Sequence, residues 1–257
     1  MPTPTPTPAL VIGLTVYKLA LGPLLLAQGR SLRKTAIRLP EPTGARMGAA
    51  VPATGSTPSV CRLLVVGDSS AAGVGVATQA DGLACLTAGA LAARLGVTVE
   101  WRLAARSGVN TTEALAMLQS LPLEPADVIV TALGVNDVTS QQSRGAFLRS
   151  YAALWEHLKA ATGARLAVVS GLPPFREFPS VPWPLRAYLG SYATYLESAL
   201  AAWCETHPDL AFRPLDMETQ AGDMASDGYH PGPRQYRVWA EAVATQIAGL
   251  METSGRR

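Results

Sequence analysis

From residue 61 onward, the chain alternates between two kinds of segment. Short runs rich in aliphatic and β-branched residues end at glycine-containing turns, and each is followed by a longer stretch with helical periodicity. Strands are expected at residues 62–66, 97–103, 128–133, 166–170 and, on a weaker pattern, 210–213. Helices are expected at residues 82–95, 112–121, 145–162, 185–206 and 234–251.

The runs expected to be strands are apolar at consecutive positions, so both of their faces are hydrophobic. Strands of this kind occur in parallel sheets whose two faces are both covered by helices, whereas a one-sided antiparallel strand would alternate. The pattern therefore predicts an α/β fold with a central, mainly parallel five-stranded sheet. Ligand sites in such sheets lie beyond the C-terminal ends of the strands, so the residues that follow each run are the ones to examine.

The first 58 residues differ from the rest. A Pro/Thr repeat at residues 2–8 should be extended, and the apolar run 9–27 that follows has the length that a membrane span requires, although Lys18 and Pro23 interrupt it. Membrane association, by spanning or by lying in the interface, and a docked or disordered segment both remain open. Residues 38–58, rich in Pro, Gly, Ala and Thr, indicate a linker.

Charge divides the chain in the same place. The first fifty residues hold six cations and one acidic residue, a net charge of +5, which leaves fifteen cations and eighteen acidic residues, a net charge of −3, for the remainder. The cations are Lys18, Arg30, Arg33, Lys34, Arg38 and Arg46. If the apolar run spans a membrane, those that follow it would favour a cytoplasmic C-terminal side. No positive residue precedes the run, so a cleaved signal peptide fits poorly, and a cytoplasmic or inner-membrane-associated protein is favoured over an exported one.

We therefore expect three parts: an N-terminal element over residues 1–58, a globular domain over 59–252 and a polar tail over 253–257. The mildly acidic domain has no clustered basic stripe, which disfavours binding to nucleic acid. Three cysteines without close pairing and three scattered histidines fit neither a disulfide scaffold nor a metal site. The turn Gly73-Val74-Gly75 lacks the third glycine of the dinucleotide fingerprint, so nucleotide binding is also disfavoured.

A candidate nucleophile follows the first expected strand, in the sequence Gly67-Asp68-Ser69-Ser70. A glycine before a serine at a strand-to-helix turn leaves the hydroxyl exposed and its backbone N–H free to donate to a reacting carbonyl. Taken alone, the motif is weak, and a structural turn capped by the carboxylate of Asp68 is the preferred interpretation.

The next two strand ends offer candidate hydrogen-bond donors for the same site. Gly108 would let the backbone approach a ligand closely, although Thr111 or Thr112 as a helix cap is the simpler explanation of that turn. Asn136, in Gly134-Val135-Asn136-Asp137, places a side-chain amide just past the sheet edge, where it can donate to a developing oxyanion or serve as an ordinary turn residue.

The last motif is Asp227-Gly228-Tyr229-His230, directly before the final helix. A carboxylate three residues ahead of a histidine can accept from one ring nitrogen and leave the other to take a proton from a serine. His157 lies inside an expected helix and His207 at a helix end, so neither has such a local partner. His230 is therefore the candidate base.

Together, the four motifs resemble the SGNH hydrolases, or GDSL esterases, in the order that this family shows, over nearly all of residues 62–249. The resemblance implies a flavodoxin-like three-layer α/β/α sandwich that acts on small-molecule or lipid esters without a metal or organic cofactor. It assigns Ser69 as nucleophile, His230 as base and Asp227 as the residue that orients the base. The backbone N–H groups of Ser69 and Gly108 and the Asn136 side chain become the oxyanion hole. Ser70 departs from the family, which usually has leucine at a position that packs behind the nucleophile.

The substrate is less defined. The loop 171–184 leaves the fourth strand, is stiffened by five prolines and carries Phe175, Phe178 and Trp183, which either line an acyl pocket or seal the loop against the domain. A serine esterase acting on short to medium acyl chains is the main hypothesis. Carbohydrate deacetylation, lysophospholipid hydrolysis and thioester hydrolysis are alternatives on the same scaffold, and a membrane-tethered binding module with a vestigial site is an alternative of another class.

Overall fold

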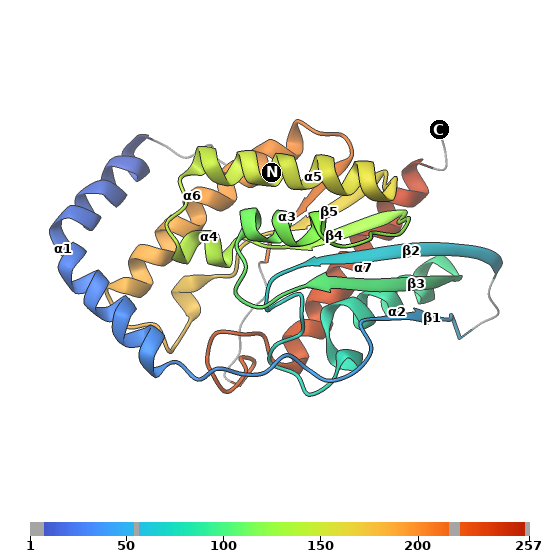
Figure 1. Cartoon of the computed structure of the whole chain (residues 1–257), viewed down its shortest axis with the longest axis horizontal. Helices are drawn as coiled ribbons and strands as arrows, with labels where there is room; N and C mark the ends of the chain where they lie inside the picture. Colours follow the sequence, from blue (N-terminus) through green and yellow to red (C-terminus); the bar gives the residue numbers. More distant parts are fainter. Residues whose placement is uncertain (1–7, 54–56, 216–221, 255–257) are drawn as a thin grey trace.

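A computed structural model describes residues 8–53, 57–215 and 222–254, and it has a mixed sheet between two layers of helices (Figure 1). The strands are β1 (Met47–Ala50), β2 (Thr57–Gly67), β3 (Val97–Ala105), β4 (Val128–Ala132), β5 (Leu166–Ser170) and β6 (Leu210–Arg213). The α-helices are α1 (Pro8–Thr35), α2 (Leu83–Leu95), α3 (Thr111–Gln119), α4 (Val135–Thr139), α5 (Arg144–Thr162), α6 (Leu185–Glu205) and α7 (Pro233–Ser254). Two 3₁₀ turns are η1 (Gln79–Asp81) and η2 (Phe175–Glu177).

The expected α/β/α architecture is confirmed, with one strand more than the expected five. The six strands lie in the order β1-β3-β2-β4-β5-β6, and every neighbouring pair is parallel except β1 with β3. The additional strand β1 lies inside the region expected to be a linker. Its sequence, Met-Gly-Ala-Ala, contains no β-branched residue, so its pairing with β3 decides its conformation rather than its own propensity.

Both faces of the sheet are apolar because alternate side chains of each strand enter two separate cores. Leu63 and Val65 of β2 point into the core beneath α2 and α7, while Leu64 and Val66 point into the core beneath α3, α5 and α6. All four are buried. The consecutive apolar positions in the sequence are therefore explained by two helical layers, which Figure 1 shows above and below the strands.

The N-terminal apolar run forms most of α1, which docks against α6 through one face (Figure 1). Leu25 is buried there, and Tyr17 stacks on Tyr188 with ring centroids 6.0 Å apart. Gln28 fixes the position, since its Nε2 donates to the carbonyl of Trp183 at 2.9 Å and its Oε1 accepts from the N–H of Leu185 at 3.1 Å. In the part of the chain that the structure describes, α1 is also the one helix long and apolar enough to cross a membrane.

Element ends depart from the sequence expectations in a few places. The helix α1 continues through the basic turn to Thr35, and α7 continues to Ser254, into the region expected to be a polar tail. The short helix α4 has only five residues, too few for a periodic pattern to reveal. The turn into α3 is capped by Asn110 and not by Thr111 or Thr112: the Asn110 side chain accepts from the N–H of Glu113, and the Glu113 carboxylate accepts from the N–H of Asn110.

Candidate active site

The four strand-end motifs meet at the C-terminal edge of the sheet. Ser69 follows β2, Gly108 follows β3, Asn136 lies in the first turn of α4 after β4, and the loop before α7 brings Asp227 and His230 to the same place. All five residues line one cavity of about 560 Å³. A parallel sheet aligns the strand ends in this way, which is why motifs separated by up to 161 positions become neighbours.

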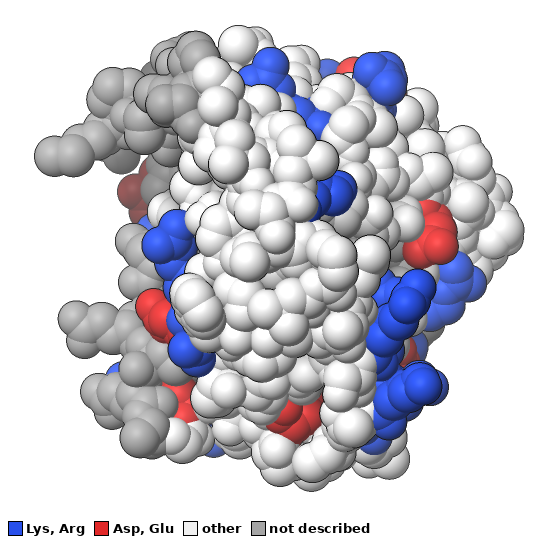
Figure 2. Space-filling model, turned by 90° about the vertical axis from the view of Figure 1, so that its left-hand side faces the viewer, with Lys and Arg blue, Asp and Glu red and all other residues white. Residues whose placement is uncertain are grey.

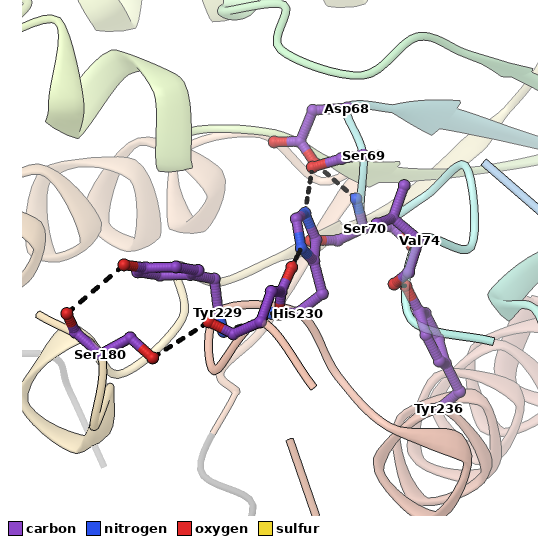
Figure 3. Close-up of polar contacts among 9 residues, drawn as sticks. Asp68, Ser69, Ser70, Val74, Ser180, Tyr229, His230 and Tyr236 are labelled. Carbon is purple, nitrogen blue, oxygen red and sulfur yellow. Dashed lines mark hydrogen bonds and ion pairs between the residues drawn. The ribbon is translucent and has the colours of Figure 1, made fainter. Parts of the chain in front are cut away.

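Ser69, His230 and Asp227 form a connected hydrogen-bond chain, and Figure 3 shows its contact between Ser69 and His230. The Nε2 atom of His230 lies 2.8 Å from Ser69 Oγ, and its Nδ1 atom lies 2.6 Å from Asp227 Oδ2. Both distances are within hydrogen-bond range, so one nitrogen of the imidazole contacts Ser69 and the other contacts Asp227. The arrangement has the geometry by which a carboxylate orients an imidazole and the imidazole deprotonates a hydroxyl.

The carboxylate of Asp227 is held ionised by its surroundings. Its Oδ1 accepts from the backbone N–H of Tyr229 at 2.9 Å and of His230 at 3.1 Å, in addition to the His230 side chain at Oδ2. Burial acts to raise the pKa of Asp227, but these hydrogen bonds outweigh it and hold the pKa below its usual value. A carboxylate that stays ionised beside an imidazole can stabilise the protonated form of that imidazole.

The loop of the base is fixed from two sides. Ser180 Oγ donates to the carbonyl of Asp227 at 3.0 Å, a contact drawn in Figure 3. On the other side, Gly75 has a φ of +111°, and a Cβ atom there would lie 2.2 Å from the carbonyl oxygen of Pro231. The glycine turn that superficially suggested a nucleotide fingerprint is thus needed for the close approach of the His230 loop.

The turn of the nucleophile is anchored by a buried tyrosine of α7. The hydroxyl of Tyr236 contacts the carbonyl oxygens of Ser70 at 2.9 Å and Val74 at 2.7 Å, and the N–H of Val74 donates to the carbonyl of Ser69 at 3.0 Å (Figure 3). Tyr236 is fully buried, and burial raises its pKa well above the ordinary value, so it stays a neutral donor. Sequence reasoning missed Tyr236 because its partners lie more than 160 positions away.

Three donors are available beside the nucleophile. Among the described residues, the backbone N–H groups of Ser69 and Gly108 have no protein acceptor. The amide of Asn136 uses one hydrogen to donate to the carbonyl of Val109 at 2.9 Å, which leaves its second hydrogen for a ligand. Because Val109 adjoins Gly108, this bond also ties the two donors together. The φ of +84° at Gly108 is a conformation that favours glycine.

A buried carboxylate supports the same loop. Asp137 accepts from the backbone N–H of Thr111 at 3.0 Å and from its hydroxyl at 3.0 Å, and its side chain is fully buried. Burial raises the pKa of Asp137, and the hydrogen bonds from Thr111 partly oppose that effect. Asp137 thereby fixes the start of α3 relative to α4, the two elements that present Gly108 and Asn136. Its place directly after Asn136 was the one available sequence signal for this role.

Asp68, next to the nucleophile, is a second buried carboxylate. Its Oδ1 accepts from the N–H of Ser70 at 2.9 Å, which confirms the capped turn that was considered for this motif. Burial raises the pKa of Asp68 to about 7, against the opposing effect of the Ser70 hydrogen bond and with a further contribution from the charge of Asp137. The capped turn is compatible with a nucleophilic role for Ser69, because the same turn places Ser69 Oγ within hydrogen-bond distance of His230.

The cavity wall is mostly apolar and includes only part of the expected aromatic set. Phe175 and Phe178 line it, with ring centroids 5.1 Å apart, and both are buried. The expectation that Trp183 lines an acyl pocket is wrong: its side chain is 70% exposed and lies outside the cavity, because the chain turns at that point to enter α6 beside α1. The wall is completed by residues that follow β4 and by the N-terminal segment, namely Leu133, Val135, Leu32, Ile37 and Leu39.

The segment after α1 also contacts the turn that contains Gly108. The carboxylate of Glu41 accepts from the N–H of Ser107 at 2.9 Å and from its hydroxyl at 2.7 Å, and it pairs with Arg46 at 3.0 Å. Arg46 in turn donates to the carbonyl of Ala105. Residues in the region expected to be a linker thus fix the position of the turn that contains Gly108.

The remaining candidates take structural positions. His157 lies in α5 with a buried Nε2 that has no partner among the described residues, and His207 at the end of α6 contacts the carbonyl of Trp203 through Nδ1. Cys61, Cys85 and Cys204 are free thiols. Within the described ranges, no group of three His, Cys, Asp or Glu side chains is arranged to hold a metal ion.

Comparison with known proteins identifies the family of this chain. Residues 65–238 match the GDSL-like lipase/acylhydrolase family, which is two thirds of the sequence, so the chain belongs to this family of SGNH hydrolases. A comparison with curated proteins finds no match.

Solved structures show the same fold. The crystal structure of TesA is 25% identical, with a TM-score of 0.55 over 74% of this chain and 99% of its own. An aryl esterase of M. smegmatis is 21% identical, with a TM-score of 0.55 over 74% of this chain and 99% of its own. A carbohydrate acetylesterase family member from Sinorhizobium meliloti is 15% identical, with a TM-score of 0.58 over 75% of this chain and 99% of its own. About a quarter of this chain lies outside each of these alignments.

Proposed function

We propose that this chain is a serine esterase that hydrolyses carboxylic esters through an acyl-enzyme formed on Ser69. The observation that carries the proposal is the unbroken chain of hydrogen bonds from Ser69 Oγ through His230 to Asp227, at 2.8 and 2.6 Å. A serine hydroxyl is a weak nucleophile on its own, and an oriented imidazole is the usual means of activating it. The esterase relatives of the same fold support the proposal.

In the first half of the reaction, Ser69 Oγ attacks the ester carbonyl while His230 Nε2 takes its proton. The carbonyl oxygen becomes an oxyanion, stabilised by the N–H groups of Ser69 and Gly108 and by the free amide hydrogen of Asn136. When the tetrahedral intermediate collapses, the ester C–O bond breaks and the alcohol leaves with the proton from His230. Asp227 remains ionised throughout and stabilises the transient imidazolium.

In the second half, water takes the place of the alcohol. His230 removes a proton from the water, the hydroxide attacks the acyl carbon, and the same three donors stabilise the second oxyanion. Collapse of this intermediate breaks the bond to Ser69, whose oxygen recovers its proton from His230. The products are the carboxylic acid and the free enzyme.

The cavity favours an acyl chain over a carbohydrate as the group held beside Ser69. Its volume of about 560 Å³ is within the usual range for small-molecule sites, and Phe175, Phe178 and Val181 contribute apolar surface. A sugar ring would need more polar partners than this wall offers. The intact contacts of Ser69, His230 and Asn136 favour an active enzyme over a binding module with a vestigial site.

The test is hydrolysis of p-nitrophenyl butyrate by the purified full chain. Wild-type protein should release p-nitrophenol without added cofactor, and Ser69→Ala should lose on the order of 10⁶-fold in kcat, down to background. The matched control is Ser70→Ala, the neighbouring serine, whose contacts with Asp68 and Tyr236 use only its backbone and are kept. Full activity of Ser69→Ala would overturn the proposal.

A further inference from the structure

The helix α1 has two apolar faces, and only one of them is packed. Leu14, Tyr17, Leu21 and Leu25 point toward α6 and the core beneath it. The opposite face carries Ile12, Val16, Leu19 and Leu26, which are 64%, 59%, 78% and 62% exposed. At 100° per residue these four lie within about 80° of arc, so they form one continuous stripe, here called the outer stripe.

An apolar stripe of this size on a helix surface is unusual for a protein surrounded only by water, and it marks a contact with lipid or with another protein. Figure 2 views the molecule from the side on which α1 lies. The middle of that face carries few charged side chains, and Lys and Arg side chains gather mainly along its margins.

The distribution of charge along α1 indicates what kind of partner covers the outer stripe. The outer stripe is continued at the C-terminal end of α1 by Arg30, Arg33 and Lys34, and Arg38 follows the helix. No Asp or Glu occurs in α1. Lys18, about 120° around the helix from Ile12, lies outside the outer stripe. The other cations of α1 lie beyond its apolar residues, at the C-terminal end, as expected where side chains enter the acyl region while cations meet anionic headgroups. A protein partner would not require this separation.

An exposed tryptophan lies beside the same helix. Trp183 is 70% exposed, and its carbonyl accepts from Gln28 of α1. The indole combines a large apolar ring with one N–H donor, which favours the boundary between headgroups and acyl chains. Its exposure, which argues against a pocket role, is explained if the side chain enters a bilayer together with α1.

The basic end of α1 leads directly to the active-site cavity. Leu32 in the last turns of the helix and Ile37 and Leu39 just after it line that cavity, and Ile37 is 59% exposed. The cation Arg38 lines the cavity as well. One apolar surface therefore continues from the segment that follows α1 to the wall facing Ser69.

We propose that the outer stripe of α1, with Trp183 and the adjoining cations, docks the enzyme on the surface of an anionic phospholipid bilayer, from which esters enter the cavity past Ile37. The inner face of α1 stays packed on α6, so the helix lies against the membrane and does not cross it. The docking is independent of catalysis, whereas the entry of esters rests on the proposed esterase function.

Docking is tested by flotation of full-length Ser69→Ala protein with vesicles, so that no hydrolysis changes the lipid. Vesicles of phosphatidylcholine containing phosphatidylglycerol should carry the protein, and pure phosphatidylcholine should carry much less. Leu19→Glu should lower the partition coefficient about tenfold or more. Arg30→Glu with Lys34→Glu should lower binding to the anionic vesicles by roughly fivefold for each cation. The matched control is Leu121→Glu, an exposed leucine between α3 and β4, which should bind as wild type.

Binding should also shift the fluorescence of Trp183 to shorter wavelength, and Trp183→Phe should remove most of that shift. The docking proposal is overturned if the Ser69→Ala chain fails to float with anionic vesicles, or if adding Leu19→Glu to that chain leaves flotation unchanged. It is likewise overturned, in favour of self-association, if the chain is a dimer that Leu19→Glu converts to monomer without any vesicle binding by wild type.

Delivery of esters from the membrane is tested with two p-nitrophenyl esters, one soluble in water and one dissolved in vesicles. Leu19→Glu in the active chain should hydrolyse soluble p-nitrophenyl butyrate as wild type does, and should lose about tenfold in rate on p-nitrophenyl dodecanoate dissolved in anionic vesicles. Equal loss on both substrates would contradict delivery by the membrane face. Failure of wild type on the soluble ester would instead count against the esterase function and leave the flotation result standing.

Discussion

The globular domain and the N-terminal segment both contribute residues to the same cavity, but those residues are brought there by different kinds of contact. In the domain, Ser69, Asn136 and His230 each sit at the end of a strand or the start of a helix, and the parallel sheet brings them together. In the N-terminal segment, no local motif marks Leu32, Ile37 or Glu41. Their contacts are made with residues far along the chain. The N-terminal segment therefore completes the cavity and supports the turn of Gly108, in addition to docking through α1.

Removal of the proposed base, His230, should have the largest effect on activity. His230→Ala should lose on the order of 10⁶-fold in kcat on a soluble aryl ester, because Ser69 then has no proton acceptor. Asp227→Ala should lose less, roughly 10⁴-fold, since the imidazole is still present but is no longer oriented. His207→Ala, at the end of α6, is the control and should keep wild-type kcat. A loss in Asp227→Ala larger than that in His230→Ala would contradict the assigned roles.

Removing one oxyanion donor should have an intermediate effect. Asn136→Ala should lower kcat by roughly 10² to 10³-fold with a smaller change in KM, because the amide acts mainly on the charge that develops during attack. Steady-state kinetics on p-nitrophenyl butyrate measure both parameters. An unchanged kcat would exclude Asn136 from the oxyanion hole.

The buried Asp68 provides a test by pH. Its pKa is about 7 in the folded chain and 3.8 ordinarily, so the folded state binds more protons than the unfolded state between these values. The contribution of Asp68 to stability therefore falls as pH rises from about 4 to about 7, by an amount of the order of a few kcal/mol. Asp68→Asn, which keeps an acceptor for Ser70, should gain stability relative to wild type across this range. Urea denaturation at several pH values measures the difference, and parallel profiles would contradict the expected shift.

A smaller effect is expected from the N-terminal segment. Glu41→Gln weakens the contacts with Ser107 and Arg46 and should lower kcat by about tenfold, because the turn of Gly108 is then less well fixed. Ser107→Ala removes only the hydroxyl contact and should lose less than Glu41→Gln. If Glu41→Gln has wild-type kcat, the segment does not act on the oxyanion hole.

The smallest effects concern acyl-chain preference. Phe178→Leu changes the cavity wall and should alter the ratio of kcat/KM between butyrate and octanoate aryl esters by a few-fold. Trp183→Ala should leave that ratio unchanged in solution, since the side chain lies outside the cavity. A changed ratio in Trp183→Ala, or an unchanged ratio in Phe178→Leu, would contradict this description of the cavity wall.

Most of the domain could be predicted from sequence because its signals are local. Apolar runs such as the one ending at Val66 marked the strands, and a carboxylate three positions before His230 marked that histidine as the candidate base. Each of the first three motifs follows a strand, and parallel strands end at the same edge of the sheet. These signals therefore sufficed to predict that the motifs meet at that edge.

What the sequence did not reveal depends on pairing over long distances. The strand β1 is formed from Met-Gly-Ala-Ala only because it pairs with β3, and Glu41 lies 66 positions from Ser107. The hydroxyl of Tyr236 contacts carbonyls more than 160 positions away. Trp183 was misjudged for the same reason, since the docking of α1 beside its loop decides which way that loop faces. None of these contacts leaves a local pattern.

The central claim, that Ser69 is an activated nucleophile, is tested most directly by covalent labelling. The full-length chain is treated with a fluorophosphonate probe, digested and examined by mass spectrometry to locate the adduct. We predict one adduct, on Ser69, that disappears in Ser69→Ala and is strongly slowed in His230→Ala. An adduct on another residue, or labelling of Ser69→Ala equal to that of wild type, would contradict the account.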